Sequence, residues 1–226
     1  MHSLVLASQL GAACGARVAT ADRSTPAEME VGEDAQAAAE LVGWYNFIWE
    51  GGSCDICLRP GGHFYSPLYP APASWRLEKG VVRINWGWYG NYELIALNKS
   101  MEGHVAGNES QWRKATYLWP LSAEERLLIG DGAGTEWDFA WEGGNVLVQF
   151  MGDGFNHFVC DAYPLHAHWT LLGNAVQINW GSRGKYELLL NAEGRIMMGG
   201  PRGGDWGREW RRATFLRDLA DNRAAA

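Results

Sequence analysis

Aromatic and basic side chains with binding chemistry recur at matching places in the two halves of the chain. Indole and phenol rings stack on sugars and on flat apolar molecules, and a guanidinium group binds carboxylates and phosphates. We therefore expect a ligand-binding set in each half. The candidates are Trp49, His63, Trp86, Trp88, Tyr92 and Arg113 in the first half, and Trp141, His157, Trp180, Tyr186 and Arg211 in the second.

Structural roles compete with binding for most of these residues. The alternating tryptophans fill a core as readily as they contact a ligand. Arg113 and Arg211 each follow a tryptophan, and we favour a structural role for them on a closing strand. Trp88 is the exception, because it lies in a predicted turn where the second half has Ser182. We expect Trp88 to be an exposed contact residue.

The cysteine pair Cys54 and Cys57 has the C-x-x-C spacing of redox and zinc sites. The pair falls on a predicted strand, where residues three apart face opposite ways. The second half carries Val146 and Gln149 at these positions, and no second C-x-x-C follows. We therefore interpret both cysteines as ordinary strand residues.

Histidines offer a second metal hypothesis. His166 and His168 are two apart and would share a strand face, so together with His157 they could bind a metal. The first half has Pro72 and Ser74 in place of this pair. We favour a polar rim or turn role, and we expect neither a metal nor another cofactor.

Repeated carboxylates raise the question of glycoside hydrolysis, which uses two acids. The candidates are Glu50 and Glu142, before Gly-Gly turns, and Glu93 and Glu187, on predicted strands. Each pair has one member per half, whereas a single active site would not need both copies. We expect these residues to lie in turns, in solvent or beside an arginine. No catalytic residue is predicted.

The elements that position these residues form an internal duplication. "RINWGWYGNYELIAL" at 83–97 is repeated as "QINWGSRGKYELLL" at 177–190. "FIWEGG" recurs as "FAWEGG", and "QWRKATYL" as "EWRRATFL". Each half shows eight short segments with period-two alternation, separated by Gly, Pro or Asn. Connections this short predict antiparallel neighbours.

Strand parity predicts a closed barrel in each half. Val82, Ile84 and Trp86 share one face, while Arg83 and Asn85 share the other. Eight strands with one apolar face bury that face by curling into a barrel, which also removes exposed edges. We predict an all-β fold of two tandem antiparallel up-and-down barrels, with a short N-terminal helix and a helical linker.

The pattern resembles lipocalin-like (calycin-type) barrels. The residues that carry the resemblance are Trp44, the stretch 61–64 ("GGHF") and the pair Trp112-Arg113, and the likeness covers 44–118 and 136–216. It implies that Trp44 lies near Arg113, and Trp137 near Arg211. Each copy is shorter than a typical lipocalin, and avidin-like barrels are equally close in size.

The predicted domains divide the whole chain. They are a targeting or disordered segment (1–25), a helical leader (26–43), a first barrel (44–121), a linker (122–135), a second barrel (136–218) and a tail (219–226). The N-terminal segment is rich in Ala and Ser and has no acid before Asp22. An organelle transit peptide and a disordered terminus of a cytoplasmic protein both fit, so the compartment stays open.

Composition narrows the partners. The 226 residues carry a formal net charge of −7 without a basic patch, which argues against nucleic acid, and contain no apolar run long enough to span a membrane. The 13 tryptophans favour a non-catalytic protein that binds a small apolar or sugar-like ligand. The alternative is a ligand-free β scaffold or accessory subunit that contacts a protein partner. A glycoside-type hydrolase ranks third.

Overall fold

A computed structural model describes residues 34–220 of the chain. The predicted segment 1–25 and most of the predicted tail lie outside these residues. Of the predicted leader helix, residues 34–40 are described and are helical. No helix within the described part of the chain is long and apolar enough to cross a membrane.

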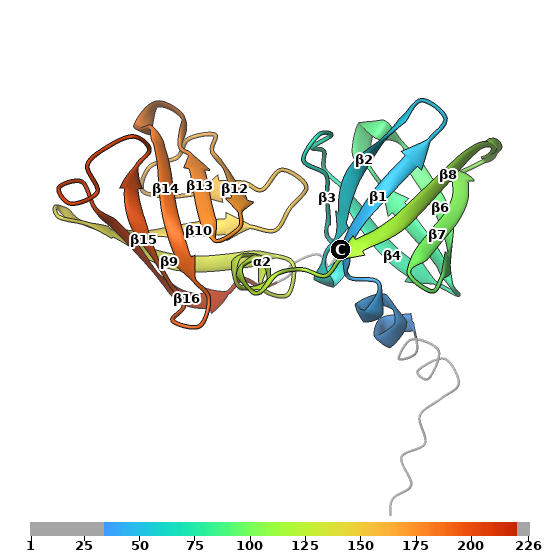
Figure 1. The fold of residues 1–226 in the computed structure, drawn as a ribbon, viewed down its shortest axis with the longest axis horizontal. Coiled ribbons are helices and arrows are strands. Elements are labelled where there is room, and N and C mark those ends of the chain that lie inside the picture. The colour runs from blue at the N-terminus through green and yellow to red at the C-terminus, as the bar shows by residue number, and fades with distance from the viewer. Residues whose placement is uncertain (1–33, 221–226) are drawn as a thin grey trace, which may run out of the picture.

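The described chain forms two antiparallel eight-stranded sheets, each curled into a nearly closed barrel (Figure 1). The first contains β1 (Gly43–Trp49), β2 (Gly52–Leu58), β3 (Phe64–Tyr65), β4 (Ser74–Glu78), β5 (Val81–Asn85), β6 (Asn91–Leu97), β7 (Ser100–Val105) and β8 (Asn108–Trp119). The second contains β9 (Gly134–Trp141), β10 (Gly144–Met151), β11 (Phe158–Val159), β12 (His168–Leu172), β13 (Ala175–Asn179), β14 (Lys185–Asn191), β15 (Ile196–Pro201) and β16 (Arg211–Asp218). The predicted fold class is confirmed.

Both barrels close in the same way. The first and last strands of each repeat pair, β1 with β8 and β9 with β16, so the remaining edges are β3 and β4 in one sheet and β11 and β12 in the other. A single bridge joins each pair of edges, His63 to Ser74 and His157 to His168. Each barrel is therefore closed at this seam by one pair of residues.

The third strand of each repeat is shorter than predicted. The alternation predicts strands over 63–69 and 155–163, but the ladders contain only two residues each. In the first repeat Pro67 and Pro70 follow directly, and proline has no N–H to donate to a neighbouring strand. The chain instead forms a loop that carries Tyr69 to the end of the barrel.

The predicted parity is confirmed in both repeats. Val82, Ile84 and Trp86 are buried, while Arg83 is half-buried and Asn85 is exposed. Their counterparts Val176, Ile178 and Trp180 are also buried. Each fully buried aliphatic side chain contributes about 1.5–3 kcal/mol to folding. Each barrel is thus stabilised by an apolar core of its own.

The linker contains the short helix α2 (Ala123–Ile129), which begins at a capping box. Glu125 N–H donates to Ser122 Oγ, and Ser122 N–H donates to Glu125 Oε2. The other carboxylate oxygen of Glu125 accepts the indole N–H of Trp44 at 2.8 Å. The helix is thereby fixed to the first barrel, while its buried Leu128 and Ile129 join the core of the second.

A buried arginine joins the two barrels. Arg59 follows β2, is 2 % exposed, and has its guanidinium carbon 4.4 Å from the centre of the Tyr65 ring. Its Nη1 donates to the carbonyl oxygens of Gly152 and Asp153 and to Oδ1 of Asn156, all in the second barrel. These bonds cross the interface and fix the loop between β10 and β11.

Candidate ligand-binding site

One end of the first barrel holds a small aromatic cavity. It has a volume of about 200 Å³, and the residues around it are Phe47, Trp49, Tyr69, Trp86, Tyr89, Tyr92 and Arg113. They come from β1, the β3–β4 loop, the end of β5, the one-turn 3-10 helix η2 (Gly87–Tyr89), β6 and β8. We call this site the first mouth.

The rings of the first mouth meet mainly edge to face. The ring centroids of Phe47 and Tyr92 are 5.3 Å apart, those of Tyr69 and Tyr89 are 5.4 Å apart, and those of Trp86 and Tyr89 are 5.8 Å apart. This arrangement is favourable because the positive edge of one ring meets the negative face of another.

Hydrogen bonds fix the rings that line the first mouth. The indole N–H of Trp86 donates to the carbonyl of Tyr69 at 2.9 Å, and the Tyr92 hydroxyl donates to the carbonyl of Tyr89 at 2.7 Å. Burial raises the pKa of Tyr92 and outweighs the opposing effect of Arg113, so its phenol keeps its proton. These bonds hold the Trp86 and Tyr92 rings in place at the cavity wall.

The repeated Gly-Gly turn explains how Trp49 is held at the rim. A Cβ added at Gly51 would lie 3.1 Å from the Trp49 indole nitrogen. The equivalent Cβ at Gly143 would lie 2.9 Å from that of Trp141. Each indole thus packs closely on its own turn, and a larger residue there would press on the ring. The "WEGG" motif positions an aromatic ring at each barrel end.

Arg113 supplies the charged group of the first mouth. Its guanidinium carbon lies 5.5 Å from the Tyr92 ring centre, and Nη1 donates to the carbonyl of Trp112 at 2.7 Å. The side chain is only half-buried. Its other N–H groups can therefore donate to a hydroxyl or carboxylate of a molecule in the cavity.

The structure brings four predicted residues of the first repeat together and leaves two outside. Trp49, Trp86, Tyr92 and Arg113 line the cavity. Trp88 is 65 % exposed next to Tyr89, and its ring contacts Phe155 of the second barrel at a centroid distance of 6.0 Å. His63 is buried at the barrel seam opposite Ser74, away from the cavity lining.

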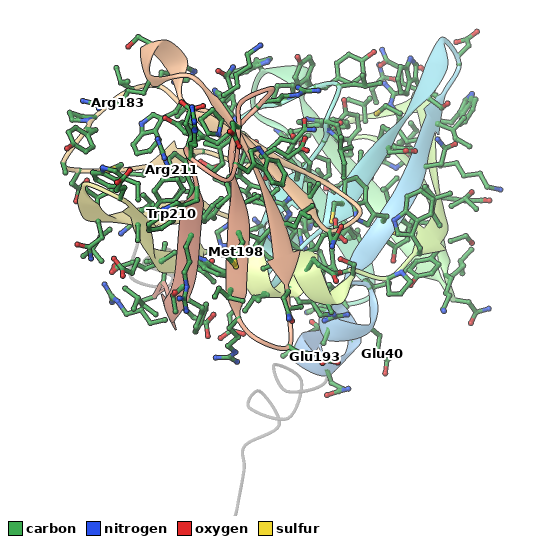
Figure 2. The ribbon with its side chains drawn as sticks, turned by 60° about the vertical axis from the view of Figure 1, so that its left-hand side comes forward. Glu40, Arg183, Glu193, Met198, Trp210 and Arg211 are labelled. Atoms are coloured by element: carbon green, nitrogen blue, oxygen red, sulfur yellow. The ribbon has the colours of Figure 1, made fainter. Side chains whose placement is uncertain are left out.

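The second barrel has the same aromatic frame with one decisive difference. Arg183 occupies the position of Tyr89, and its guanidinium carbon lies 3.7 Å from the centre of the Tyr163 ring. Figure 2 shows Arg183 and Arg211 in the upper half of this barrel, with Glu193 at its lower end. Arg183 therefore covers the aromatic ring that corresponds to Tyr69.

The remaining predicted residues of the second repeat keep the arrangement of the first. Trp180 and Tyr186 have ring centroids 6.2 Å apart, and the Arg211 guanidinium carbon lies 5.4 Å from the Tyr186 ring centre. Trp141 packs on its Gly-Gly turn, as described above. His157 is separate from this frame and lies in a histidine cluster at the barrel seam.

Three lining residues were not predicted from the sequence, namely Phe47, Tyr69 and Tyr89. Phe47 alternates with Tyr45 and Trp49 on β1, so its inward direction was available from parity. Tyr69 recurs as Tyr163 within an aligned "YP". Tyr89 gave no signal by recurrence, because its counterpart is Arg183.

The Trp–Arg contact implied by the lipocalin resemblance is wrong. Trp44 pairs with Trp119 at one end of β1, whereas Lys114, the neighbour of Arg113, pairs with Ile48 near the other end. The same register holds in the second barrel, where Trp137 pairs with Phe215, and Arg212, next to Arg211, pairs with Ala140. Both arginines therefore lie at the aromatic end of their barrels.

The two cysteines of the C-x-x-C pattern face opposite sides of β2. Cys54 packs in the core of the first barrel, and Cys57 joins the cluster centred on the second. Burial raises the pKa of Cys54 to about 11 and that of Cys57 to about 12. Both are protonated thiols near neutral pH, unlike the thiolates of redox and metal sites.

The repeated carboxylates on the strands are bound by neighbouring side chains. Arg83 forms an ion pair with Glu93, and the Gln177 amide donates to Glu187 at 2.9 Å. Glu50 and Glu142 lie at the ends of hairpins in different barrels. Each pair of equivalent carboxylates thus has one member in each repeat.

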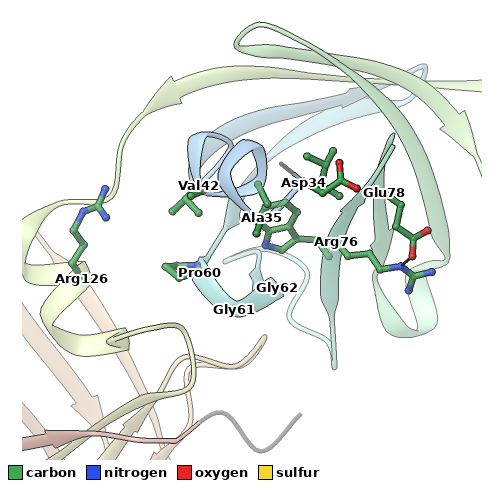
Figure 3. Close-up of a pocket in the computed structure, with 13 residues that line it drawn as sticks. Asp34, Ala35, Val42, Pro60, Gly61, Gly62, Arg76, Glu78 and Arg126 are labelled. Atoms are coloured by element: carbon green, nitrogen blue, oxygen red, sulfur yellow. Dashed lines mark hydrogen bonds and ion pairs between the residues drawn. The ribbon is translucent and has the colours of Figure 1, made fainter. Parts of the chain in front are cut away.

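A second hollow lies where the N-terminal helical residues meet the first barrel (Figure 3). Its volume is about 720 Å³. Its walls include Ala35 and Val42, the turn at Gly61, and Arg76, with Arg126 of α2 on the far side. Arg76 is paired with Glu78 there, and the remaining wall is mostly small apolar residues.

Comparison of the chain with protein-family models, with curated proteins and with solved structures finds no match.

Proposed function

We propose that the first barrel is a non-catalytic binding module that holds one small ring-shaped ligand, a sugar or a flat apolar molecule, in the first mouth. The observation that carries this proposal is the preformed cavity of about 200 Å³ between fixed aromatic rings, with Arg113 at its rim. Aromatic faces with a few directed polar groups are the usual lining of a small-molecule site.

The size of the cavity supports a single ring rather than a long lipid. Sites for drug-sized ligands measure about 300–1,000 Å³. Deeper in the barrel, Ile56, Ile84, Leu94 and Met101 are buried and belong to one apolar cluster. The resemblance to lipocalin-like barrels thus extends, in this proposal, to binding at the open end and not to a deep ligand chamber.

The first mouth and the equivalent end of the second barrel provide a matched pair for testing the proposal. Tyr89→Arg places in the first mouth the residue that covers Tyr163 in the second, and Arg183→Tyr does the reverse. Tryptophan fluorescence should be titrated with methyl glycosides and with small aromatic carboxylates. Wild type should give a saturable shift, Tyr89→Arg should lose it, and Arg183→Tyr should retain it or gain a second binding event.

Two results would overturn this function. One is a panel without any saturable response in wild type. The other is equal binding by wild type and Tyr89→Arg, which would show that the ligand sits elsewhere. The glycosides and the aromatic acids distinguish the two ligand classes, because only the acids carry a charge that Arg113 can neutralise.

A second candidate, a scaffold that binds a protein partner, is favoured by an apolar row on the outside of the second barrel. Leu172, Ala175, Leu189 and Met198 are successive cross-strand partners over β12 to β15. Leu172, Leu189 and Met198 are all exposed, and Met198 is marked in Figure 2. Exposed apolar patches of this kind mark interaction surfaces.

The first barrel provides the control for this surface. The equivalent row there reads Glu78, Val81, Ile95 and Glu102, so charges replace Leu172 and Met198. The double variant Leu172→Glu and Met198→Glu carries the first barrel's residues. If the row binds a protein, native mass spectrometry of the chain from its source should show a bound protein that this variant loses. Retention of that partner by the variant would exclude the surface.

A further inference from the structure

Three histidines of the second barrel converge at the seam where its sheet closes. His157 precedes β11, His168 is the first residue of β12, and His166 lies two residues earlier. The bridge between His157 and His168 closes the barrel and stacks their rings at a centroid distance of 5.0 Å. One ligand nitrogen from each of the three lies within 4.8 Å of the others.

Two of the rings are oriented by a second group. His157 Nδ1 lies 2.5 Å from Asp153 Oδ2, and His168 Nδ1 lies 3.0 Å from the carbonyl oxygen of Phe155. Both partners accept a hydrogen bond, so each Nδ1 carries a proton, and in the neutral imidazole each Nε2 then has the lone pair that a metal needs. Metal-binding histidines are normally held this way, by a carboxylate or carbonyl on the nitrogen away from the metal.

The third ring completes the set. His166 is exposed, and its Nε2 lies 2.8 Å from His168 Nε2. Nitrogens bound to one tetrahedral zinc at 2.0–2.1 Å are about 3.3 Å apart. This pair must therefore separate by about 0.5 Å, and the exposed His166 side chain can move to bring the three ligand nitrogens, now within 4.8 Å of one another, around one metal.

The loop that orients the histidines is itself fixed by the first barrel. Arg59 binds the carbonyls of Gly152 and Asp153 and the side chain of Asn156. Gly154 packs so closely that an added Cβ would lie 1.9 Å from the carbonyl oxygen of Ala71. Asp153 and Phe155 are thereby held in place without a metal.

The first barrel lacks this arrangement. It has Pro72 and Ser74 where the second has His166 and His168. Its loop before His63 is also two residues shorter than the loop before His157 and contains no carboxylate. These three differences between the repeats thus coincide at the seam, and each of them adds a metal ligand or its orienting group in the second barrel.

We propose that His157, His166 and His168 bind a divalent transition metal of the zinc class through three imidazole nitrogens. Neutral imidazole is a preferred ligand of this class. Three protein ligands leave a fourth position for water or an anionic ligand, as in zinc sites that are not purely structural. This site is separate from the first mouth and does not depend on the ligand proposed there.

The test is titration of the purified chain with zinc against a chromophoric chelator, with cobalt absorption as the report on geometry. Wild type should bind one equivalent of metal, and bound cobalt should give the visible bands of a four-coordinate site. The variant His166→Ala with His168→Ser, the latter being the first barrel's residue, should bind at least about 100-fold more weakly. Asp153→Asn should weaken binding by about 10-fold.

The control is His104→Ala, which removes a histidine of the first barrel whose ring nitrogen contacts its neighbour's carbonyl. This variant should bind the metal as wild type does. Circular dichroism of every variant without metal should match wild type, which separates loss of ligands from loss of fold. Absence of saturable binding in wild type, or equal binding by the double histidine variant, would overturn the proposal.

Discussion

Arg59 of the first barrel donates a hydrogen bond of 2.8 Å to Oδ1 of Asn156 in the second, and the arginine is almost completely buried. Its counterpart in the second repeat is Met151, because Trp75 and Trp169 donate their indole protons to the carbonyls of Arg59 and Met151 respectively. The duplication thus supplies two similar barrels, and a non-repeated residue joins them.

Arg59→Met should weaken the association of the two barrels. The change leaves Asn156 and two carbonyls without their buried donor, and we expect a loss of about 3 kcal/mol in the free energy of unfolding. Differential scanning calorimetry should show a lower or divided transition. Arg76→Met removes an exposed arginine and should change stability little. Equal effects of both variants would contradict the structural role of Arg59.

Two equivalent glycines should be intolerant of alanine. A Cβ at Gly103 would lie 1.9 Å from the Glu93 carbonyl oxygen, and one at Gly199 would lie 2.0 Å from that of Glu187. Each substitution should cost about 3 kcal/mol because neighbouring strands must separate. Gly107→Ala, in a turn with φ of +75° and open space around it, should cost only about 1 kcal/mol. Urea denaturation measures all three, and similar costs would contradict the barrel register.

The buried thiols should make the protein less stable as pH rises above about 9. Burial raises the pKa of Cys54 and Cys57 from 9.0 to about 11 and about 12. Between these values the folded chain keeps thiol protons that the unfolded chain has lost, so the free energy of unfolding falls with pH. The contribution is complete below pH 9 and is lost as pH rises toward 12.

Urea midpoints between pH 8 and pH 10 test this sign. The double variant Cys54→Ala with Cys57→Ala should be less stable throughout, because it removes buried atoms, but its midpoint should vary less with pH. A steeper dependence in the variant, or wild-type stability that rises over this range, would show that the thiols are not buried as described.

The equivalent variants Trp86→Phe and Trp180→Phe should distinguish an effect on stability from an effect on ligand affinity. Trp86 donates its indole proton to the Tyr69 carbonyl, so its replacement leaves that carbonyl without the bond and disturbs a wall of the first mouth. We expect a loss of about 1–2 kcal/mol in stability, together with weaker ligand binding. Trp180→Phe should affect stability without affecting ligand affinity. A fluorescence-independent method such as isothermal titration calorimetry is appropriate here.

The barrels could be predicted from the sequence because strand parity and the repeat are local signals. The apolar residues Val82, Ile84 and Trp86 recur at every second position, which indicates a half-buried strand without any knowledge of its neighbours. The third strand of the first repeat is shorter than predicted because the alternation continues through Pro67 and Pro70, where the strand ladder cannot.

The sites could not be predicted in full, because they depend on contacts between residues that are far apart in the sequence. Arg59 differs from the repeat, but its partners lie over ninety residues away. The substitution of Tyr89 by Arg183 was visible in the alignment of the two halves, while its effect on Tyr163 required ring positions. The sequence indicates His157, His166 and His168 as a possible metal set but favours a rim or turn role, and the barrel seam is what places His157 against His168.

The most direct test of the binding proposal is the shift of individual indole N–H resonances in a 1H–15N spectrum during titration with the ligand that responds best in the fluorescence panel. We expect the signals from Trp49 and Trp86, which line the first mouth, to move. The signals from Trp141 and Trp180 should stay unchanged. The binding proposal would be contradicted if only the Trp141 and Trp180 signals moved, or if no indole signal moved at saturation.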